Sequence, residues 1–405
     1  MEIFVGIDWA EQHHDVAVVD GSGEVLARFR IGDDVAGLTR LTEAVAGLCG
    51  DPAAVHVALE TDRGLLVTAL VAGGYRVFAI NPKSVDRYRD RYSVSRAKSD
   101  PGDALVLAHL LRTDEPRHRP LAGDSHAVAV IATLARAHHD AVRLRTSESN
   151  RLRSVLREFF PAAVEAFPAL ATKTAMTVLN AAPTPTAAAQ LTTEQLWELI
   201  RSTGRHGVSR QLPHRLHAIF TAEQMRQPPA VEQAMGCAVR AVLASLIACD
   251  HAVDQLEAEL GRHFDRHPHA EVLRSLPGLG LVLGARVLGE FGDDPTRFTD
   301  ADSRRRYAGS APITRTSGKS RVVLMRRARN TRLADACRWW AFNAISRSDG
   351  AQAYYRRRRA AGDGHDAALR RVANKLLGQL HHCLQHNEPY REQTAWPVKC
   401  TELAS

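Results

Sequence analysis

Residues 3–31, IFVGIDWAEQHHDVAVVDGSGEVLARFRI, decide how the first part of this chain folds. Apolar runs over 2–9, 14–20 and 24–31 predict three strands. The stretch Asp20-Gly21-Ser22-Gly23 separates the second run from the third and is typical of a hairpin turn. The segment therefore predicts an antiparallel meander at the start of the chain.

The pattern after this meander adds β–α units. We expect a helix over about 35–48, a strand over 54–60, a helix near 64–72 and a strand over 75–80. This order of elements occurs in ribonuclease H-like domains and in the halves of actin-like ATPases. The sequence therefore predicts a mixed α/β domain, followed by a chain that is mostly helical.

Four acidic residues stand where this topology can bring carboxylates together. Asp8 and Glu60 each end an apolar run, while Asp100 and Asp103 share one face of a predicted helix. Converging carboxylates are the usual ligands of hard divalent cations, and such a site suits metal-assisted phosphoryl transfer. Each residue also has an ordinary explanation, because Asp100 could cap its helix ahead of Pro101 and Glu60 could open a loop.

Positive charge is concentrated in parts of the chain. Lys and Arg number 53 against 45 Asp and Glu, and residues 304–359 hold sixteen of the basic residues with only two acids. Such a local excess is compatible with nucleic-acid binding. A shorter basic run beside the acidic residues could hold a phosphate backbone or be a solvated helix face; it contains Lys83, Arg87, Arg89, Arg91, Arg96 and Lys98, interleaved with Tyr88 and Tyr92.

A tight turn, Pro277-Gly278-Leu279-Gly280, lies between two helical patterns. It is similar to the turn of a helix–hairpin–helix, in which backbone N–H groups at a helix N-terminus bind phosphate without sequence preference. A purely structural turn that packs two helices together is the alternative.

Ser317 lies in a small-residue segment, 307–321, among basic residues. Gly318 would let a backbone approach this serine closely. A serine hydroxyl is a weak nucleophile unless a base, a metal or nearby positive charge helps it, and Arg315, Lys319 and Arg321 could stabilise a phosphate under attack. The ordinary reading of the segment is a Ser- and Thr-rich loop.

The middle of the chain carries two heptad stripes. They are Val130, Leu134, Ala137, Ala141 and Leu144, resumed by Val155 and Phe159, and then Val242, Leu246, Cys249, Val253, Leu256 and Leu260. The stripes indicate either an antiparallel helical hairpin within one chain or a coiled coil that joins protomers. We expect a loop over 181–191 and a loose tail from about 390 onward.

Six scattered cysteines form no C-x-x-C pair, which fits a reducing cytosol. No apolar run approaches the roughly 20 residues needed to span a membrane, and the chain opens on a strand rather than on a signal pattern. The composition, rich in Ala, Arg and Gly, hints at a bacterial source. We expect a cytoplasmic, nucleoid-associated bacterial protein without a membrane partner.

Two motif blocks in this order resemble the DEDD transposases of bacterial insertion sequences, the bridge-RNA-guided recombinases. The first block is Gly6-Ile7-Asp8-Trp9-Ala10, Leu59-Glu60-Thr61 and Lys98-Ser99-Asp100-Pro101-Gly102-Asp103-Ala104; the second is Leu276-Pro277-Gly278-Leu279-Gly280 and Ala308-Gly309-Ser310-Ala311-Pro312, followed by Ser317-Gly318-Lys319. The resemblance covers most of the chain. It implies a RuvC-like catalytic domain over 1–122, a helical coiled-coil domain over 123–266, a mostly helical C-terminal transposase domain over 267–390 and a tail over 391–405.

The resemblance also implies roles and partners. Asp8, Glu60, Asp100 and Asp103 match a metal-binding tetrad that takes Mg²⁺ or Mn²⁺, and Ser317 matches the serine that becomes covalently joined to DNA. The implied partners are donor and target DNA, a structured guide RNA and further copies of the chain, as a dimer or tetramer in which tetrad and serine come from different protomers. The expected nucleic-acid contacts are Lys83, Arg87, Arg96, Lys98, Gly278, Gly280, Arg315, Lys319 and Arg321.

Three other functions fit parts of this pattern. A RuvC-like structure-specific endonuclease would share the tetrad but would hydrolyse DNA with water and form no serine adduct. A DNA-binding protein without activity would explain the arginines but not the carboxylates. An actin-like ATPase would share the strand order, but it needs glycine-rich phosphate loops, and Asp20–Gly23 is only a short turn.

Overall fold

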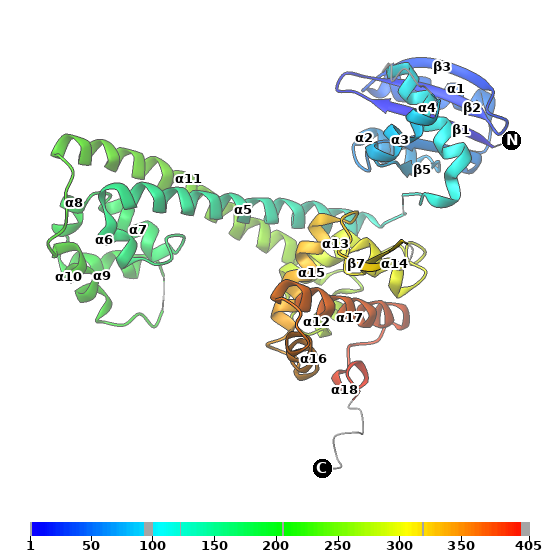
Figure 1. Cartoon of the computed structure of the whole chain (residues 1–405). Helices are drawn as coiled ribbons and strands as arrows, with labels where there is room; N and C mark the ends of the chain where they lie inside the picture. Colours follow the sequence, from blue (N-terminus) through cyan, green and yellow to red (C-terminus); the bar gives the residue numbers. More distant parts are fainter. Residues whose placement is uncertain (1, 93–99, 122, 205, 318–319, 398–405) are drawn as a thin grey trace, which may run out of the picture. The chain divides into compact units, whose positions relative to one another are not determined.

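The computed structural model describes residues 2–92, 100–121, 123–204, 206–317 and 320–397 (Figure 1). A few side chains within these ranges are not described, namely those of Lys83, Asp90, Arg91, Tyr92, Asp100, Pro101 and Arg321. The chain divides into two compact units, Met1–Gly123 and Asp124–Ser405.

The first unit is built on a five-stranded mixed sheet with strand order β3-β2-β1-β4-β5. Its strands are β1 (Ile3–Trp9), β2 (His13–Asp20), β3 (Val25–Gly32), β4 (Val55–Leu59) and β5 (Arg76–Ala79). The first three form the predicted antiparallel meander, while β4 runs parallel to both β1 and β5. These bounds, and those of α1 (Val35–Leu48) and α2 (Leu65–Ala72), confirm the mixed α/β prediction to within one or two residues.

Helices cover both faces of this sheet. Leu41 of α1 and Leu70 of α2 are buried against one face, in a core shared with Val5 and Val57. Helices α3 (Pro82–Tyr92) and α4 (Asp100–Asp114) cover the other face, where Phe78 is fully buried. Strands β1, β2 and β4 are therefore buried on both faces, whereas the edge strand β3 stays partly exposed.

Helix α4 runs antiparallel to β1. At Gly6 it lies so close that a Cβ would come within 1.9 Å of the carbonyl oxygen of Ala104. Near the other end of the helix, Arg112 donates a hydrogen bond of 3.3 Å to the carbonyl of Gly21, in the turn beside the start of β1. The N-terminus of α4 therefore lies at the carboxyl end of β1.

The second unit contains a long antiparallel helical hairpin formed by α5 (His126–Phe159) and α11 (Pro229–Asp265), which lie side by side in Figure 1. Arg145 pairs with Asp250 at 2.9 Å, and His138 lies 3.6 Å from Glu257. Residues later in α5 thus contact residues earlier in α11, so the two helices are antiparallel. Of the two arrangements that the heptad stripes allow, the structure has the hairpin within one chain.

The stripe predicted for α11 is confirmed, with Leu256 half-buried, but the stripe predicted for α5 is wrong in part. Of its residues Phe159 is buried, and Leu134, Ala141 and Val155 are half-buried. Val242, Leu246, Cys249, Val253 and Leu260 of α11 are buried. In α5 the buried residues are Val128, Ile131, Ala135, His138, Leu152, Leu156 and Phe159, whereas Val130 and Leu144 are 39% and 54% exposed. Polar His138 and Arg145 lie in the middle of the α5 face that packs on α11. A prediction based on apolar residues alone therefore chose the neighbouring face of the helix.

Helix α11 also corrects the prediction that no apolar run approaches the length of a membrane span. An 18-residue window within it has a mean hydropathy of 1.5, enough by length and composition to cross a membrane. Core helices of water-soluble proteins meet the same criterion, and 44% of this window is buried inside the structure.

The far end of the hairpin carries a helical cluster with its own core. Phe160, Phe220, Leu196 and Leu243 are buried there together. Its helices are α6 (Pro161–Ala166), α7 (Lys173–Ala181), α8 (Pro185–Ala189), α9 (Thr193–Ser202) and α10 (Leu212–Thr221). The loop predicted over 181–191 thus contains a short helix, α8, which Thr184 caps and Pro185 begins.

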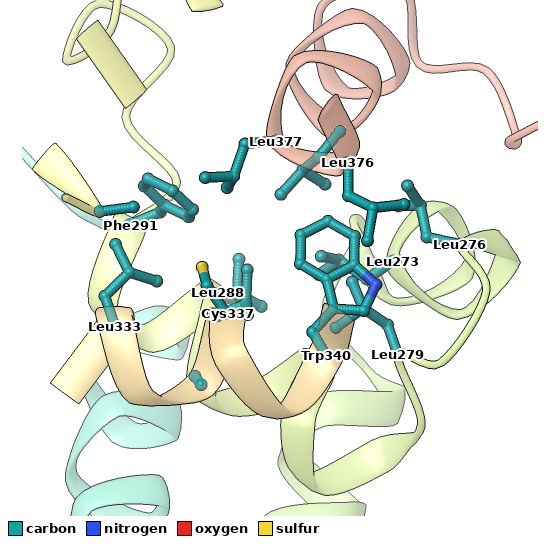
Figure 2. Packing of buried hydrophobic residues seen from close by; sticks show 14 of the residues in the cluster. Leu273, Leu276, Leu279, Leu288, Phe291, Leu333, Cys337, Trp340, Leu376 and Leu377 are labelled. Atoms are coloured by element: carbon teal, nitrogen blue, oxygen red, sulfur yellow. The ribbon is translucent and has the colours of Figure 1, made fainter. Parts of the chain in front are cut away.

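The other end of the hairpin carries a second core around Trp340, which points into a cluster of leucines that includes Leu273 and Leu376 (Figure 2). The Trp340 Nε1–H donates a 2.9 Å hydrogen bond to the carbonyl of Pro277. The elements here are α12 (Ala270–Ser275), α13 (Leu281–Phe291), α14 (Ala301–Tyr307), β6 (Ile313–Ser317), β7 (Ser320–Leu324), α15 (Thr331–Ala344), α16 (Asp349–Ala360), α17 (His365–His386) and α18 (Glu392–Ala395).

The predicted loose tail is partly packed. The Trp396 ring lies 5.6 Å from Tyr354 of α16, and its Nε1–H donates to the Tyr390 hydroxyl at 2.9 Å. The backbone N–H of Tyr390 donates to Ser275. Residues 390–396 therefore belong to the second core, because aromatic side chains near the end of the chain find partners there.

A carboxylate, Glu290 of α13, connects several elements of this core and is only 6% exposed. Arg136 of α5 donates to both of its oxygens, at 2.8 and 3.1 Å, and the side chain of Asn330 donates at 2.7 Å. Burial by itself would raise the pKa of Glu290, but the hydrogen bonds from Arg136 and Asn330 outweigh burial and lower it. The ionised form is therefore the form that stabilises the fold.

We predict that Glu290→Gln lowers the stability of the second unit by about 2–4 kcal/mol, because one amide cannot accept all three hydrogen bonds. Urea denaturation followed by tryptophan fluorescence measures this loss, with Glu198→Gln, at an exposed position of α9, as the control. Since the folded-state pKa is lowered, the difference should be complete above about pH 4.5 and shrink as the pH falls through that lowered pKa. Equal midpoints for the two variants at neutral pH would contradict this role.

Candidate functional site

The carboxyl ends of β1 and β4 bring Asp8 and Glu60 to one edge of the sheet. Ile7 pairs with Leu59 in the parallel register, and each acid is the next residue along the chain. Asp8 is the last but one residue of β1, and Glu60 directly follows β4. Asp8 is half-buried and Glu60 is exposed. The prediction that these residues lie at neighbouring strands is confirmed, since β1 and β4 are adjacent in the sheet.

Helix α4 brings the second acidic pair to the same edge. Ala104 lies against Gly6, two residues before Asp8, and Asp103 directly precedes Ala104. Asp100 is the first residue of the helix, although its side chain lies outside the described part. Two segments that are far apart in the sequence therefore place their acidic positions at the carboxyl end of β1.

Asp103 already has a positive partner. Its carboxylate is only 5% exposed, and Arg89 of α3 lies 2.7 Å from its Oδ1. Arg89 also pairs with Asp86, at 3.2 Å. A buried carboxylate needs such a partner. The sequence could not predict that Arg89 is this partner, because the basic run contains several similar arginines.

A further acid, Asp15, lies opposite Asp8 in the antiparallel register of β1 and β2. It is 6% exposed and accepts two hydrogen bonds from Arg30, at 3.0 and 2.8 Å. Directly opposed residues share a face of the sheet, so Arg30 offsets the repulsion between the two carboxylates. Asp15 therefore stabilises the pairing of β2 with β3 and is not part of the cluster formed by Asp8, Glu60 and Asp103.

The acidic edge, formed by Asp8, Glu60 and Asp103, fits a divalent cation in the type of its donor atoms. Carboxylate oxygens are the ligands that Mg²⁺ prefers, and Asp8, Glu60 and Asp103 supply them from neighbouring elements. Among the described side chains, however, no group of three or more His, Cys, Asp or Glu is gathered closely enough to hold a metal. The ion pair between Arg89 and Asp103 would have to yield if the latter were to become a ligand.

The basic run divides between the surface and the core. Arg87 is exposed on α3, as a phosphate contact requires. Tyr88 is buried, and its hydroxyl lies 3.1 Å from the His109 carbonyl oxygen, so this aromatic residue is structural. The remaining predicted contacts of this run cannot be placed, because Arg96, Lys98 and the side chain of Lys83 lie outside the described residues.

Ser317 lies at the tip of an antiparallel hairpin formed by β6 and β7, where it pairs with Ser320. The sequence predicted a loop here, because the strands have no buried face and show no apolar alternation. Ser317 and Arg315 are exposed, while Lys319 and the side chain of Arg321 are outside the described part. Ser310, in contrast, is only 8% exposed and accepts a hydrogen bond from Asn374.

The turn at Pro277–Gly280 joins helices α12 and α13, as predicted. Gly278 has a φ of +83°, and a Cβ there would lie 2.8 Å from the Ala344 backbone nitrogen. Gly280 caps α13 without a side-chain hydrogen bond and faces open space. A cavity of about 910 Å³ adjoins the turn, with a mixed lining that includes Arg274, Arg347, Glu257, Asp349 and Glu392. Close packing therefore requires a glycine at position 278, whereas no such contact requires one at position 280.

Comparison with known sequences finds a family match for the acidic residues and another for the segment with the glycine turn and Ser317. A family model described as a transposase of the DEDD, IS110 type matches residues 5–161. A second model, described as "Transposase IS116/IS110/IS902 family", matches residues 270–356. The first match contains all four acidic positions, and the second contains the glycine turn and Ser317.

Similarity to individual proteins extends over nearly the whole chain. The mini-circle putative transposase for IS117 of Streptomyces coelicolor is 50% identical over 98% of this chain and 97% of its own length. The IS900 42 kDa protein of Mycobacterium paratuberculosis is 28% identical, over 97% of this chain and 98% of its own. The IS116 44.8 kDa protein of Streptomyces clavuligerus is 29% identical, over 93% of both. The chain therefore belongs to the IS116/IS110/IS902 family of insertion-element transposases.

Proposed function

We propose that this transposase cuts and rejoins DNA through a phosphoserine on Ser317, with Asp8, Glu60, Asp100 and Asp103 as its metal site. The observation that carries the proposal is the antiparallel placement of α4 on β1, because it aligns the start of α4 with the ends of β1 and β4. A Mg²⁺ or Mn²⁺ ion held there would polarise the scissile phosphodiester and favour ionisation of an attacking hydroxyl.

The reaction conserves the number of phosphodiester bonds. The Ser317 Oγ attacks phosphorus, a bond from Oγ to phosphorus forms, and the bond from phosphorus to a deoxyribose oxygen breaks. The serine proton is lost and the leaving oxygen gains one, so a hydroxyl of the partner strand can later reverse the step. Arg315 lies two residues before Ser317 on β6 and hence on the same face, where its charge can stabilise the phosphate.

The first unit is proposed to be a ribonuclease H-like, RuvC-like catalytic domain. The strand order β3-β2-β1-β4-β5, with an antiparallel meander extended by parallel strands, supports this assignment. The acidic edge alone would also suit a nuclease that hydrolyses DNA with water. A covalent adduct between protein and DNA distinguishes the two reactions, because only the serine pathway forms one.

A structured guide RNA is proposed to select donor and target DNA by base pairing. The resemblance to bridge-RNA-guided recombinases and the basic segment 304–359 support this role. Pairing in the RNA would carry the specificity, so the protein need not encode it. Sequencing the RNA that co-purifies with the protein from its cytoplasmic, nucleoid-associated pool tests the proposal, and a random sample of cellular RNA would oppose it.

The protein is also proposed to act as a homo-oligomer, a dimer or tetramer. Val130, Ala137 and Leu144 are exposed and lie seven residues apart on the outer face of α5. Apolar residues that recur every seven positions and stay exposed in the described structure are suited to packing against another copy of the chain.

For the nucleophile, Ser317→Ala should abolish the protein–DNA adduct and lower recombination by at least about 10³-fold, because alanine cannot form the ester. Denaturing gel electrophoresis with labelled DNA detects the adduct. Ser320→Ala, which changes the register partner on β7, is the matched control and should retain the adduct. An adduct that persists in the Ser317 variant would exclude this serine as the nucleophile.

For the acidic edge, Asp8→Asn should reduce Mg²⁺-dependent cleavage by about 10³-fold, since a neutral amide is a poor ligand for a hard cation. Asp62→Asn serves as the control, because Asp62 is an exposed carboxylate near the same strand end. Circular dichroism and light scattering should show an unchanged fold and oligomer. Normal cleavage by the Asp8 variant would remove this residue from the proposed metal site.

For the oligomer, the double variant Val130→Glu/Leu144→Glu should shift the protein toward monomer in size-exclusion chromatography with light scattering, since two buried carboxylates per copy oppose association. Helical content should stay constant, because both positions lie outside the seam with α11. Met225→Glu, at a position that is 88% exposed, controls for added charge. An unchanged mass would place the interface elsewhere.

A further inference from the structure

A second cavity lies at the foot of the β6–β7 hairpin and measures about 320 Å³. Ser310 and Met325 line it where the chain enters and leaves the hairpin. Its remaining walls come from Arg329, the start of α15 and the first half of α17, and they carry two more arginines, Arg338 and Arg370. Charged side chains thus share its walls with apolar ones such as Met325 and Ala334, and the cavity is large enough for a phosphate group.

Its positive charges exceed its negative charges. The two acids of the lining are already paired, Asp335 with Arg286 at 2.6 Å and Asp366 with Arg338 at 3.1 Å. In the part of the chain that the structure describes, no carboxylate lies within ion-pair distance of Arg329 or Arg370. Two uncompensated guanidinium groups thus line the cavity, and guanidinium groups match phosphate oxygens well.

Two aromatic side chains continue this surface along α15. Trp339 and Phe342 are each 44% exposed, and their ring centroids lie 5.9 Å apart. The Arg338 guanidinium, at the cavity, lies 5.5 Å from the centroid of the Trp339 ring. The neighbouring Trp340 fills the core in Figure 2, so the exposure of Trp339 is not required by packing.

We propose that this surface, defined by Arg329, Arg338, Arg370, Trp339 and Phe342, binds a single-stranded polynucleotide. A backbone phosphate occupies the arginine cavity, and unpaired bases stack on the two aromatic rings. The inference rests on the proposed function, since it takes the ligand to be a strand of the DNA substrate or of the guide RNA. A duplex fits less well, because its bases are already stacked and paired.

The position of the surface gives it a role in the reaction. The hairpin rises five residues per strand from its foot to Ser317, a span of roughly 17 Å at about 3.3 Å per residue. A strand held at the foot is therefore kept close to the serine without covering it. The surface acts by positioning the strand and does not touch the reacting atoms.

The test measures binding of fluorescein-labelled oligo(dT) and oligo(rU), each about 12 nucleotides long, and of a duplex of equal length to the full chain. The double variant Trp339→Leu/Phe342→Leu should weaken binding of the single strands by about 5- to 150-fold and leave the duplex nearly unchanged. Met225→Ala, at an exposed residue outside this surface, is the apolar control.

The arginines are tested through salt dependence. Arg329→Gln/Arg370→Gln should lower the slope of log affinity against log salt concentration by about 0.7 for each phosphate that the protein no longer neutralises. Arg215→Gln, at an exposed arginine of α10 and outside the basic segment, is the matched control and should leave the slope at the wild-type value. Circular dichroism confirms that each variant is folded.

The results distinguish guide RNA from substrate DNA as the ligand, and they distinguish failure of the binding surface from failure of the proposed serine chemistry. A loss confined to oligo(rU) assigns the surface to the guide RNA, a loss confined to oligo(dT) assigns it to substrate DNA, and an equal loss supports a shared site. Unchanged affinity and slope, an equal loss on duplex, or a change in oligomeric mass without loss of binding would overturn the inference. Adduct formation through Ser317 is measured separately, so either proposal can fail while the other stands.

Discussion

The ionised carboxylate of Glu290 is the interaction on which the second unit depends most, because it fixes the base of the serine hairpin. Arg136 ties it to the long hairpin, and Asn330 ties it to the start of α15. The Asn330 backbone N–H also donates to the Tyr307 carbonyl at 3.0 Å, and its side chain donates to the Tyr307 hydroxyl at 3.1 Å. Both ends of the excursion 308–329 are thus joined at one point, so an exposed strand pair can project from a rigid foot.

A steric constraint has the same importance in the first unit. Only glycine at position 6 lets α4 lie on β1, because any larger residue would collide with the Ala104 carbonyl. That contact fixes the position of α4 along β1 and hence places Asp103 beside the end of the strand. Asp103 is buried there, and Arg89 supplies the charge that makes the burial tolerable.

The sequence predicted most of the first unit, because each strand is an apolar run bounded by turn residues, and parallel neighbours then place Asp8 and Glu60 together. It failed where polar residues occupy buried positions or apolar ones are exposed. His138 and Arg145 interrupt the apolar seam of α5, which hid its true register. Strands β6 and β7 bury no face, so no alternation marks them. Arg89 resembles the other basic residues of its run, and its partner became evident only from the packing of α3 on α4.

Under the proposed chemistry, the isolation of Ser317 is informative. A serine hydroxyl needs a base, a metal or positive charge to attack phosphorus. None of the described residues forms a hydrogen bond with its Oγ, so no histidine or carboxylate of the hairpin activates it in the manner of a triad. Arg315 can stabilise the phosphate but cannot accept a proton. In the proposed reaction a metal ion held by the acidic edge would supply the activation, which would explain why a protein with carboxylates suited to a nuclease also carries a nucleophile on a hairpin.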